Sequence, residues 1–330
     1  MAPWRARFAV LSLSLLLLLV SLSVWRRRLR VPYEVWQFSH GVLALAVVIT
    51  ALAHIGGVGY YTRGAFRQVI FDVMAASLVS TVVWARIVSP FIRLRRPWRV
   101  VRLQPERSRS TTVVIEADGH DGFEFKPGQF AWLSRWPVAM DQHPFSFSSP
   151  TAMEPNGRLT VTVKALGDWT SGLVALRPGR RVYLDGPHGE FSMDLYQAPG
   201  YVFVAGGVGI TPLYSMISTM CVREDVRPAI LFYANNDWDS VIFREQLEEL
   251  TLYMSNLRIV YVLRRPPSSW QGESGRITPH MLHRHLPRKQ YLLYEYFICG
   301  PEPLMDNAEE ALSLLGVPHE RIHSERFGMV

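Results

Sequence analysis

The segment AGGVGITP, residues 205–212, has the composition of a turn that binds phosphate groups. It follows the apolar run YVFVA and precedes PLYSMISTM, which we expect to form a strand and a helix. Glycine permits a tight turn and a close backbone approach, and the amides at a helix N-terminus attract anions such as a pyrophosphate. A glycine-rich turn alone is a weak signal, and an ordinary strand-to-helix turn is the alternative.

Two further segments combine residue types that suit a flat redox-active ring. HPFSFSSP, residues 143–150, sets an aromatic side chain beside several hydroxyls, so it can stack on a ring and hydrogen-bond to it. The alternative is an edge strand that ends in a Ser-Pro turn, and spacing alone favours that alternative. Cys299-Gly300-Pro301 stands at the carboxyl end of an apolar run, where open α/β sheets bind ligands. A lone cysteine there is otherwise a small buried apolar residue.

Two histidines, His40 and His54, lie 14 residues apart within an uncharged apolar run. At ~100° per residue this spacing puts both on one face of a helix, offset by ~21 Å along its axis. An intramembrane histidine usually faces the interior of a helix bundle, and neutral imidazole ligates haem iron. The pair could therefore serve two haems, one near each membrane surface. The alternative is a pair of partly hydrated histidines near the two helix ends.

The distribution of charge separates the first third of the chain from the rest. Of the 330 residues, 48% are hydrophobic and 19% are charged, which excludes a disordered chain. Residues 1–99 carry a net charge of +11, from thirteen arginines and two acids, and residues 100–330 carry −4. Because the basic third is also the most apolar, we expect a lipid bilayer as its partner and no nucleic acid. Two cysteines exclude a disulfide framework, a four-cysteine zinc site and a four-cysteine iron–sulfur cluster.

Three apolar stretches, at about residues 8–25, 35–61 and 69–90, predict a transmembrane domain over residues 1–96. At ~1.5 Å per residue, the first two can cross a hydrocarbon core ~30 Å thick. The first could instead be a signal peptide, but no small-residue cleavage site follows it and its far flank is basic. Arginines cluster in segments 26–34 and 86–99, which we place inside. This orientation predicts a plasma (inner) membrane protein with residues 100–330 in the cytoplasm.

Two patterns of strands follow the membrane segment. Residues 97–197 contain short alternating runs separated by Gly, Pro and Asp, which predict an antiparallel β-barrel. Residues 198–330 contain buried-type runs that alternate with helical segments, which predicts a doubly wound parallel α/β domain. The runs are RVVRL, TTVVIEA, QFAWLS, RLTVTVKAL and RRVYLDG, then YVFVAGG, PAILFYA, LRIVYVL and YEYFICG. A barrel followed by such a sheet predicts two cofactors that meet at a cleft.

Seven ordered motifs in residues 100–330 together resemble the ferredoxin–NADP reductase superfamily, and specifically the FAD and NAD(P)H half of ferric reductases and NADPH oxidases. The motifs are KPGQF (126–130), HPFSFSS (143–149), VKALGDWTSGL (163–173), GPHGEF (186–191), AGGVGITP (205–212), ICGPEPLM (298–305) and HSERF (323–327). The resemblance implies an NAD(P)H-dependent FAD oxidoreductase that moves electrons to an acceptor such as ferric iron or oxygen.

The resemblance assigns an FAD site to the first of these two domains. The form His143-Pro144-Phe145 is typical of the ferric-reductase branch. Phe145 would lie along the isoalloxazine ring, and Ser146 would hydrogen-bond near its N5 atom. Lys164 and Thr170 would help to hold the FAD phosphates.

The resemblance also assigns the NAD(P)H site. The residues expected to bind the dinucleotide are Gly206, Gly207, Gly209, Thr211, Pro212, Cys299, Gly300 and Pro301. Cys299 would lie against the nicotinamide ring, and Phe327 would cover the flavin until the nicotinamide displaces it. Cys299, Ser146 and Phe327 are therefore the candidate catalytic residues.

The sequence leaves the choice between NADPH and NADH open. NADPH-using relatives usually place an arginine after the second strand of the parallel sheet to hold the 2′-phosphate. Here that position reads Ala234-Asn235-Asn236-Asp237, and a nearby acid suits a ribose 2′-hydroxyl better. Arg244 could substitute from the following helix, which tips the expectation slightly towards NADPH. Gly275-Arg276 is expected to be a structural loop.

Residues 1–99 resemble the last three helices of the six-helix membrane domain of that family, with RRRLR, YEVWQFSHG and ALAHIGG matching its fifth helix. There, each haem b is ligated by one histidine of the third helix and one of the fifth. His40 and His54 match the fifth-helix ligands, but no third helix is present in this sequence. Three explanations stay open: the sequence is truncated, a partner membrane chain supplies the missing ligands, or no haem binds.

Three functions follow from these alternatives. The first is an enzyme that passes electrons from NAD(P)H through FAD and haem to an acceptor across the bilayer. The second is a membrane-anchored, haem-free reductase that delivers electrons to a cytoplasmic partner. The third is a non-enzymatic subunit whose helices only assemble with another membrane protein, and the complete set of flavin motifs argues against it.

Overall fold

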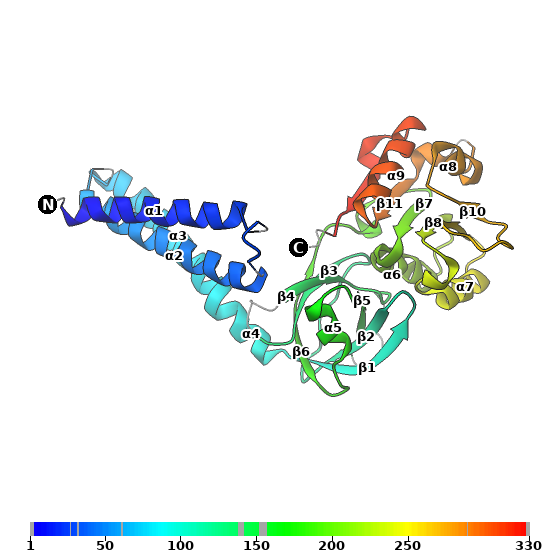
Figure 1. Cartoon of the computed structure of the whole chain (residues 1–330), viewed down its shortest axis with the longest axis horizontal. Coiled ribbons are helices and arrows are strands. Elements are labelled where there is room, and N and C mark those ends of the chain that lie inside the picture. Colours follow the sequence, from blue (N-terminus) through cyan, green and yellow to red (C-terminus); the bar gives the residue numbers. More distant parts are fainter. Residues whose placement is uncertain are drawn as a thin grey trace. The chain divides into compact units, whose positions relative to one another are not determined.

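The computed structural model divides into two compact units, one with the N-terminal helices and one with the two sheets that follow (Figure 1). The structure describes residues 3–26, 28–31, 33–60, 62–137, 142–151, 157–288 and 290–327. Three predicted boundaries lie outside these residues: residue 1 at the start of the transmembrane domain, residue 61 at the end of the second helix, and residue 330 at the end of the last domain.

The first unit is built of long apolar helices. They are α1 (Trp4–Val24), α2 (Tyr33–Val58), α3 (Ala65–Val83), the π-helical turn η1 (Trp84–Val88) and α4 (Ser89–Arg95). Among the described residues, three segments are long and apolar enough to cross a membrane: Trp4–Val24, Val35–Val58 and Ala65–Arg95. The three predicted helices are therefore present, and the third extends beyond its predicted bounds at both ends.

Helices α1 and α2 pack along each other, and the hydroxyl of Ser12 donates a hydrogen bond to the carbonyl of Val47 (3.2 Å). Neither α1 nor α3 contains a buried residue in the described part of the chain. Large apolar side chains such as Leu17 and Val73 are about 60% exposed. Burying apolar surface stabilises a chain by ~25 cal/mol per Å², so a continuous apolar exterior favours a lipid environment.

An antiparallel sheet of six strands begins the second unit, in the order β4-β3-β6-β1-β2-β5. Its strands are β1 (Trp98–Glu106), β2 (Ser110–Ala117), β3 (Phe130–Ser134), β4 (Gln142–Ser146), β5 (Leu159–Lys164) and β6 (Arg181–His188), and helix α5 (Asp168–Val174) follows β5. Alternate side chains point inward, so Val113, Ile115 and Val161 are fully buried. One isolated bridge joins Phe147 to Val161. The antiparallel sheet is confirmed, whereas the pairing of the described residues does not establish a closed barrel.

The second half of this unit is a parallel sheet with the strand order β10-β9-β8-β7-β11-β12. Its strands are β7 (Tyr201–Gly206), β8 (Ala229–Asn235), β9 (Leu257–Leu263), β10 (Glu273–Ser274), β11 (Glu295–Cys299) and β12 (Ile322–Glu325). The α-helices are α6 (Ile210–Val222), α7 (Arg244–Tyr253), α8 (Pro279–His285) and α9 (Glu302–Leu314). The short helices are η3 (Met193–Leu195), η4 (Gly207–Gly209), η5 (Trp238–Ser240), η6 (Tyr291–Leu293) and η7 (His319–Arg321).

Helices cover both faces of the parallel sheet. Met216 of α6 and Leu247 of α7 pack into the core on one face, and Leu282 of α8 and Met305 of α9 pack into the core on the other. This is the doubly wound arrangement that the sequence predicts. The four predicted strands are β7, β8, β9 and β11, and the edge strands β10 and β12 extend the sheet further.

The two sheets contact each other through helix α6. The hydroxyl of Ser215 donates to the carbonyl of Ser149 (2.6 Å), and the amide of Thr151 donates to the hydroxyl of Thr219 (3.0 Å). These contacts fix the HPFSFSSP segment against the helix that follows the glycine turn. The sites predicted on the two sheets are therefore neighbours.

Candidate functional site

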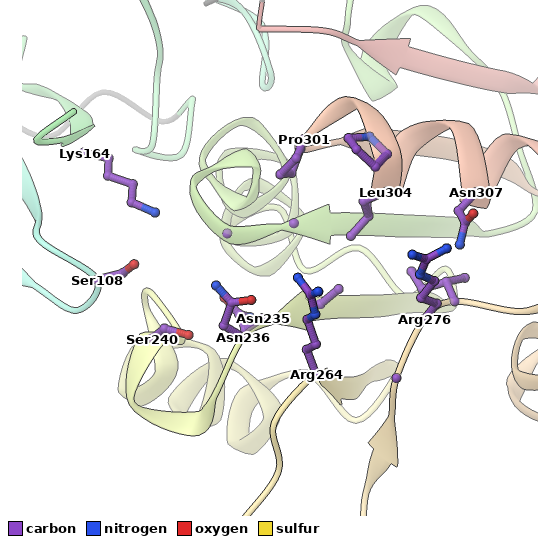
Figure 2. A pocket seen from close by; sticks show the side chains of 16 residues that line it. Ser108, Lys164, Asn235, Asn236, Ser240, Arg264, Arg276, Pro301, Leu304 and Asn307 are labelled. Atoms are coloured by element: carbon purple, nitrogen blue, oxygen red, sulfur yellow. The ribbon is translucent and has the colours of Figure 1, made fainter. Parts of the chain in front are cut away.

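A cavity of about 370 Å³ lies at the carboxyl ends of β7, β8 and β11 (Figure 2). Parallel sheets bind ligands at this edge. Its lining comprises Ser108, Lys164, Gly206, Gly207, Ala234, Asn235, Asn236, Ser240, Arg264, Gly275, Arg276, Ile277, Pro301, Pro303, Leu304 and Asn307. Predicted dinucleotide-binding residues from both the glycine turn and the segment after β11 therefore meet at one cavity.

The glycine turn is shaped by close packing against the end of β11. A Cβ atom at Gly206 would lie 2.8 Å from Pro301 Cδ, and one at Gly209 would overlap the carbonyl group of Cys299. Gly207 has φ +53°, and its Cβ position has no neighbour within 4 Å among the described residues. The turn can therefore accept only small residues on its packed side, and it keeps an open side for a ligand.

Buried hydrogen bonds hold the glycine turn in place. The hydroxyl of Tyr233 donates to the carbonyl of Gly207 (3.0 Å), and the hydroxyl of Thr211 donates to the carbonyl of Val208 (3.0 Å). Thr211 and Pro212 are buried in the first turn of α6. We predicted that Thr211 holds the dinucleotide, and the structure shows its hydroxyl engaged within the turn.

The charge of the cavity lining is positive. Lys164, Arg264 and Arg276 line it, and the described lining residues include no acid. The guanidinium groups of Arg264 and Arg276 have no hydrogen-bond or ion-pair partner in the described part of the chain. Asp237, the acid that we considered as a ribose ligand, instead pairs with Arg265 (3.1 Å). The lining therefore suits an anionic ligand.

The structure places Arg276 and Lys164 in the lining of the same cavity, and the predicted contact of Lys164 with the FAD phosphates stays a prediction. Arg276, predicted to be a structural loop residue, lines the cavity. Lys164, predicted to hold FAD phosphates, lines the same cavity, because β5 pairs with β2 beside the turn that carries Ser108. Arg244 lies 4.8 Å from the Trp238 ring centre and is not among the lining residues.

The predicted flavin-binding segment contains a buried group without a partner. Ser146 is 4% exposed, and its hydroxyl has no hydrogen-bond partner among the described residues. Unpaired polar atoms cost about 1–3 kcal/mol when buried, so a ligand edge that bonds to Ser146 would be favoured. Phe145 stacks on Trp169 with ring centres 5.6 Å apart, and His143 lies 4.1 Å from the same ring. An aromatic row beside an unpaired hydroxyl fits a flat polar ring such as the isoalloxazine.

Glu325 carries a buried carboxyl group to which the sequence assigned no role. It lies opposite Cys299 in the pairing of β12 with β11, and its Oε2 atom is buried without a partner in the described structure. Burial raises the pKa of Glu325 to about 7, and it also raises the pKa of the Cys299 thiol. The HSERF motif contained this residue, but only Phe327, which is 37% exposed, was assigned a role.

Thr170 acts locally. Its hydroxyl accepts hydrogen bonds from the amides of Leu166 and Gly167, both at 3.0 Å, and so fixes the start of α5. Its predicted contact with the FAD phosphates stays a prediction. The same holds for His143, Pro144 and the domain boundaries near residues 96 and 197.

In the helical unit, each candidate haem ligand bonds to α1. His40 Nδ1 lies 3.1 Å from the hydroxyl of Ser23, and His54 Nδ1 lies 2.8 Å from the carbonyl of Arg5. A carbonyl only accepts, so His54 donates from Nδ1 and keeps Nε2 unprotonated when neutral. The described residues contain no cluster of three or more metal-binding side chains.

Comparison with known proteins places the second unit in a family. Residues 98–192 match the FAD-binding domain family, and residues 203–310 match the oxidoreductase NAD-binding domain family. The second unit therefore consists of the FAD-binding and NAD-binding domains of the ferredoxin–NADP reductase superfamily. The chain spans 60% of the length of the first flavohemoproteins that it matches.

Individual relatives support this assignment. The chain is 31% identical over 238 residues to the stachydrine N-demethylase reductase subunit Stc4 of Rhizobium meliloti, covering 70% of this chain and 66% of that protein. It is 28% identical over 248 residues to a flavohemoprotein of Bordetella pertussis, covering 71% of this chain and 60% of the relative. The FAD/NAD-binding domain of nitric oxide dioxygenase from Vibrio cholerae has the same fold, with a TM-score of 0.61, 22% identity, and coverage of 70% of this chain and 98% of that one.

Proposed function

We propose that this chain is a membrane-anchored flavoprotein reductase that takes electrons from NADPH and delivers them to a separate acceptor. The observation that carries the proposal is the basic cavity beside the glycine turn, in the same unit as the unpaired buried atoms of Ser146 and Glu325. FAD, when bound, supplies a ring that accepts a hydride and can pass its two electrons on singly.

Preference for NADPH over NADH follows from the lining charges. Arg264 follows β9 and Arg276 follows β10, so two neighbouring strand ends direct a guanidinium group to the cavity (Figure 2). An arginine pairs strongly with a phosphate, whereas a ribose hydroxyl offers it a much weaker partner. The extra 2′-phosphate of NADPH supplies the anion that both groups lack.

The other residues take roles that match their surroundings. Lys164 would bind the pyrophosphate of NADPH from the FAD-domain side of the cavity, beside the open side of Gly207. Ser146 would hydrogen-bond the flavin edge, and Cys299 would set the distance between nicotinamide and flavin. Phe327 follows β12 and is partly exposed, which suits a side chain that covers the flavin and moves away when NADPH enters.

Anchoring in a membrane rests on the three apolar helices of the first unit. The arginine bias in the sequence favours the plasma (inner) membrane, with the reductase domains in the cytoplasm. The acceptor we favour is a partner protein, because the relative Stc4 is named a reductase subunit. Ferric iron and oxygen are the acceptors predicted from the sequence.

Haem b fits the described helices only in part. His54 offers an unprotonated Nε2, but each level of α2 provides one histidine, and a second axial ligand would have to come from outside the described residues. We therefore derive no electron step through haem, and we propose the haem-free reductase. If a partner membrane chain supplied the missing histidines, the assembly of the two chains would be the haem-containing form.

The full chain purified in detergent tests the proposal. We expect a yellow protein with about one FAD per chain. At equal low concentrations, NADPH should reduce the flavin, and so bleach its absorbance, faster than NADH does. The double variant Phe145→Ala, Ser146→Ala should lose flavin while keeping its circular dichroism spectrum. A wild-type protein that cannot be loaded with FAD would overturn the proposal. A haem spectrum in the reduced-minus-oxidised difference would instead support the haem-containing form.

A further inference from the structure

We infer that the turn between β1 and β2, residues 107–109, is a movable wall of the NADPH cavity, and that Arg107 and Glu245 are the positioning residues that hold it closed. The inference rests on the proposed function, because it concerns how long NADPH stays in that cavity. It adds a specific pair of residues, outside the ligand contacts, that controls release of the dinucleotide.

The turn belongs to the FAD domain, yet it lines the cavity of the NAD(P)H domain. Ser108 is a lining residue, and Figure 2 shows it beside Lys164 and Ser240, at the end of the cavity away from Arg276 and Asn307. Most of the other walls come from the parallel sheet and its loops. Displacing the turn would therefore open one end of the cavity while leaving the glycine turn and the arginines in place.

The turn is a tight hairpin turn whose two central residues are in the left-handed region. Ser108 and Arg109 have φ values of 58° and 57°, the left-handed region that residues with a side chain rarely adopt. The amide of Ser110 donates to the carbonyl of Arg107 (3.1 Å), so this is the type I′ turn that commonly joins two antiparallel strands. Neither central residue is the Gly or Asn that this turn prefers, so contacts outside the turn help to hold it. The amide of Ala165 donates to the carbonyl of Arg109 (3.0 Å), which ties one side of the turn to the strand end near Lys164.

The other side of the turn is held across the domain boundary. Arg107 Nη2 lies 2.5 Å from Glu245 Oε1, at the start of α7. The neighbouring Gln246 hydrogen-bonds to Glu106, so two consecutive residues at the turn meet two consecutive residues of the helix. The Arg107 guanidinium lowers the pKa of Glu245 to about 2, so this carboxylate stays ionised at neutral pH.

We expect the Arg107–Glu245 ion pair to hold the turn in place and to contribute little to the stability of the whole fold. The side chains of Arg107 and Glu245 are 31% and 61% exposed, and exposed ion pairs contribute little to overall stability. The two domains are also joined independently at α6, through Ser215 and Thr219. Loss of the ion pair should therefore release the turn without separating the domains.

The test is a double-mutant cycle on the FAD-loaded full chain in detergent, read by the dissociation rate of NADP⁺ in stopped flow. Glu245→Gln and Arg107→Gln should each raise that rate and the KM for NADPH about two- to fivefold, with the limiting rate of flavin reduction unchanged. The double variant should be no faster than the single variants, since the same contact is lost. Arg107→Lys, which keeps the charge, should restore most of the wild-type rate.

Glu116→Gln is the control, because it removes a partly exposed ion pair with Arg158 (3.2 Å) that lies inside the FAD domain. It should leave NADP⁺ dissociation unchanged. The inference is overturned if dissociation is unaffected by the turn variants, if their effects add, or if the control changes it equally. A wild-type chain that carries FAD but does not bind NADP⁺ would contradict the proposed function, and this inference with it.

Discussion

Cys299 lies directly opposite Glu325 in the parallel pairing of β11 with β12. Cys299 is fully buried, and burial brings the pKa of Glu325 to about 7 from its ordinary 4.5. A carboxyl group with a pKa near neutrality is present as both acid and base under working conditions, so it can exchange a proton with a ring that binds beside it. The register of β11 and β12 therefore places a buried thiol opposite a carboxyl group whose pKa lies near neutrality.

Replacing Glu325 with Gln should remove an ionisation from the pH profile of turnover. If Glu325 gives up a proton, it works while protonated, so wild-type turnover should fall as pH rises through about 7. Positioned proton transfer contributes about 100-fold or more, and Glu325→Gln should lose a factor of that order while its profile near pH 7 becomes flat. A variant profile that keeps the wild-type fall would assign this ionisation to another group.

The same carboxyl group predicts a pH-dependent stability. Because its pKa is raised in the folded protein, the folded state holds this proton more tightly than the unfolded chain does. The contribution of this proton to the free energy of unfolding is therefore lost as the pH rises from about 4.5 to about 7. Over that pH range, the free energy of unfolding of the FAD-free Glu325→Gln variant should rise by up to about 3 kcal/mol relative to that of the wild type. Denaturant unfolding of the full chain measures this difference. A constant difference between the two proteins would contradict the raised pKa.

Cys299→Ala should slow flavin reduction much more than it weakens NADPH binding. A side chain that only sets the distance and angle of hydride transfer acts on the chemical step, where a small misplacement costs about 100-fold. Stopped-flow reduction at several NADPH concentrations separates the limiting rate from the apparent affinity. An unchanged limiting rate would mean that Cys299 serves only in packing.

The fold was largely predictable because its signals are local. Alternation of apolar residues located β1, β2 and β3, and buried runs located β7, β8, β9 and β11. Strand β12 escaped notice because IHSE is polar and is only partly buried in the structure. Strand β10 has two residues, too few for any periodic pattern.

The site was predictable only where a motif is contiguous. The glycine turn and the Cys299 segment were found because each is a short, distinctive sequence. Arg264, Arg276 and Lys164 come from three separate strand ends. The pairing of β9 with β10 and the contact between the two domains bring them to one cavity. Glu325 needed the register of β12 against β11, together with burial, before its carboxyl group stood out.

Arg264 and Arg276 should determine the choice of nucleotide. Removing either guanidinium group should raise the KM for NADPH about 10-fold, and removing both should raise it more, since each charge-assisted bond to a phosphate contributes about 1.5–3 kcal/mol. The KM for NADH should change little. Arg265→Ala is the control, because Arg265 pairs with Asp237 and is not among the lining residues. Equal losses with NADH and NADPH would show that these arginines do not read the 2′-phosphate.

The orientation of the helices in the membrane would fix the order of the two histidines. In the orientation that we propose from the arginine bias, residues 100–330 would face the cytoplasm, and α2 would run from inside to outside, with His40 near the cytoplasmic end and His54 near the outer end. Protease added to sealed right-side-out vesicles should spare the reductase domains, and protease added to inverted vesicles should remove them. If a partner chain supplies haem ligands, His40→Ala should prevent reduction of any haem by NADPH, because the first electron enters from the flavin side. His54→Ala should spare reduction at the inner position and stop transfer outward. Digestion of the reductase domains from the outer face would reverse the orientation, and with it the order assigned to His40 and His54.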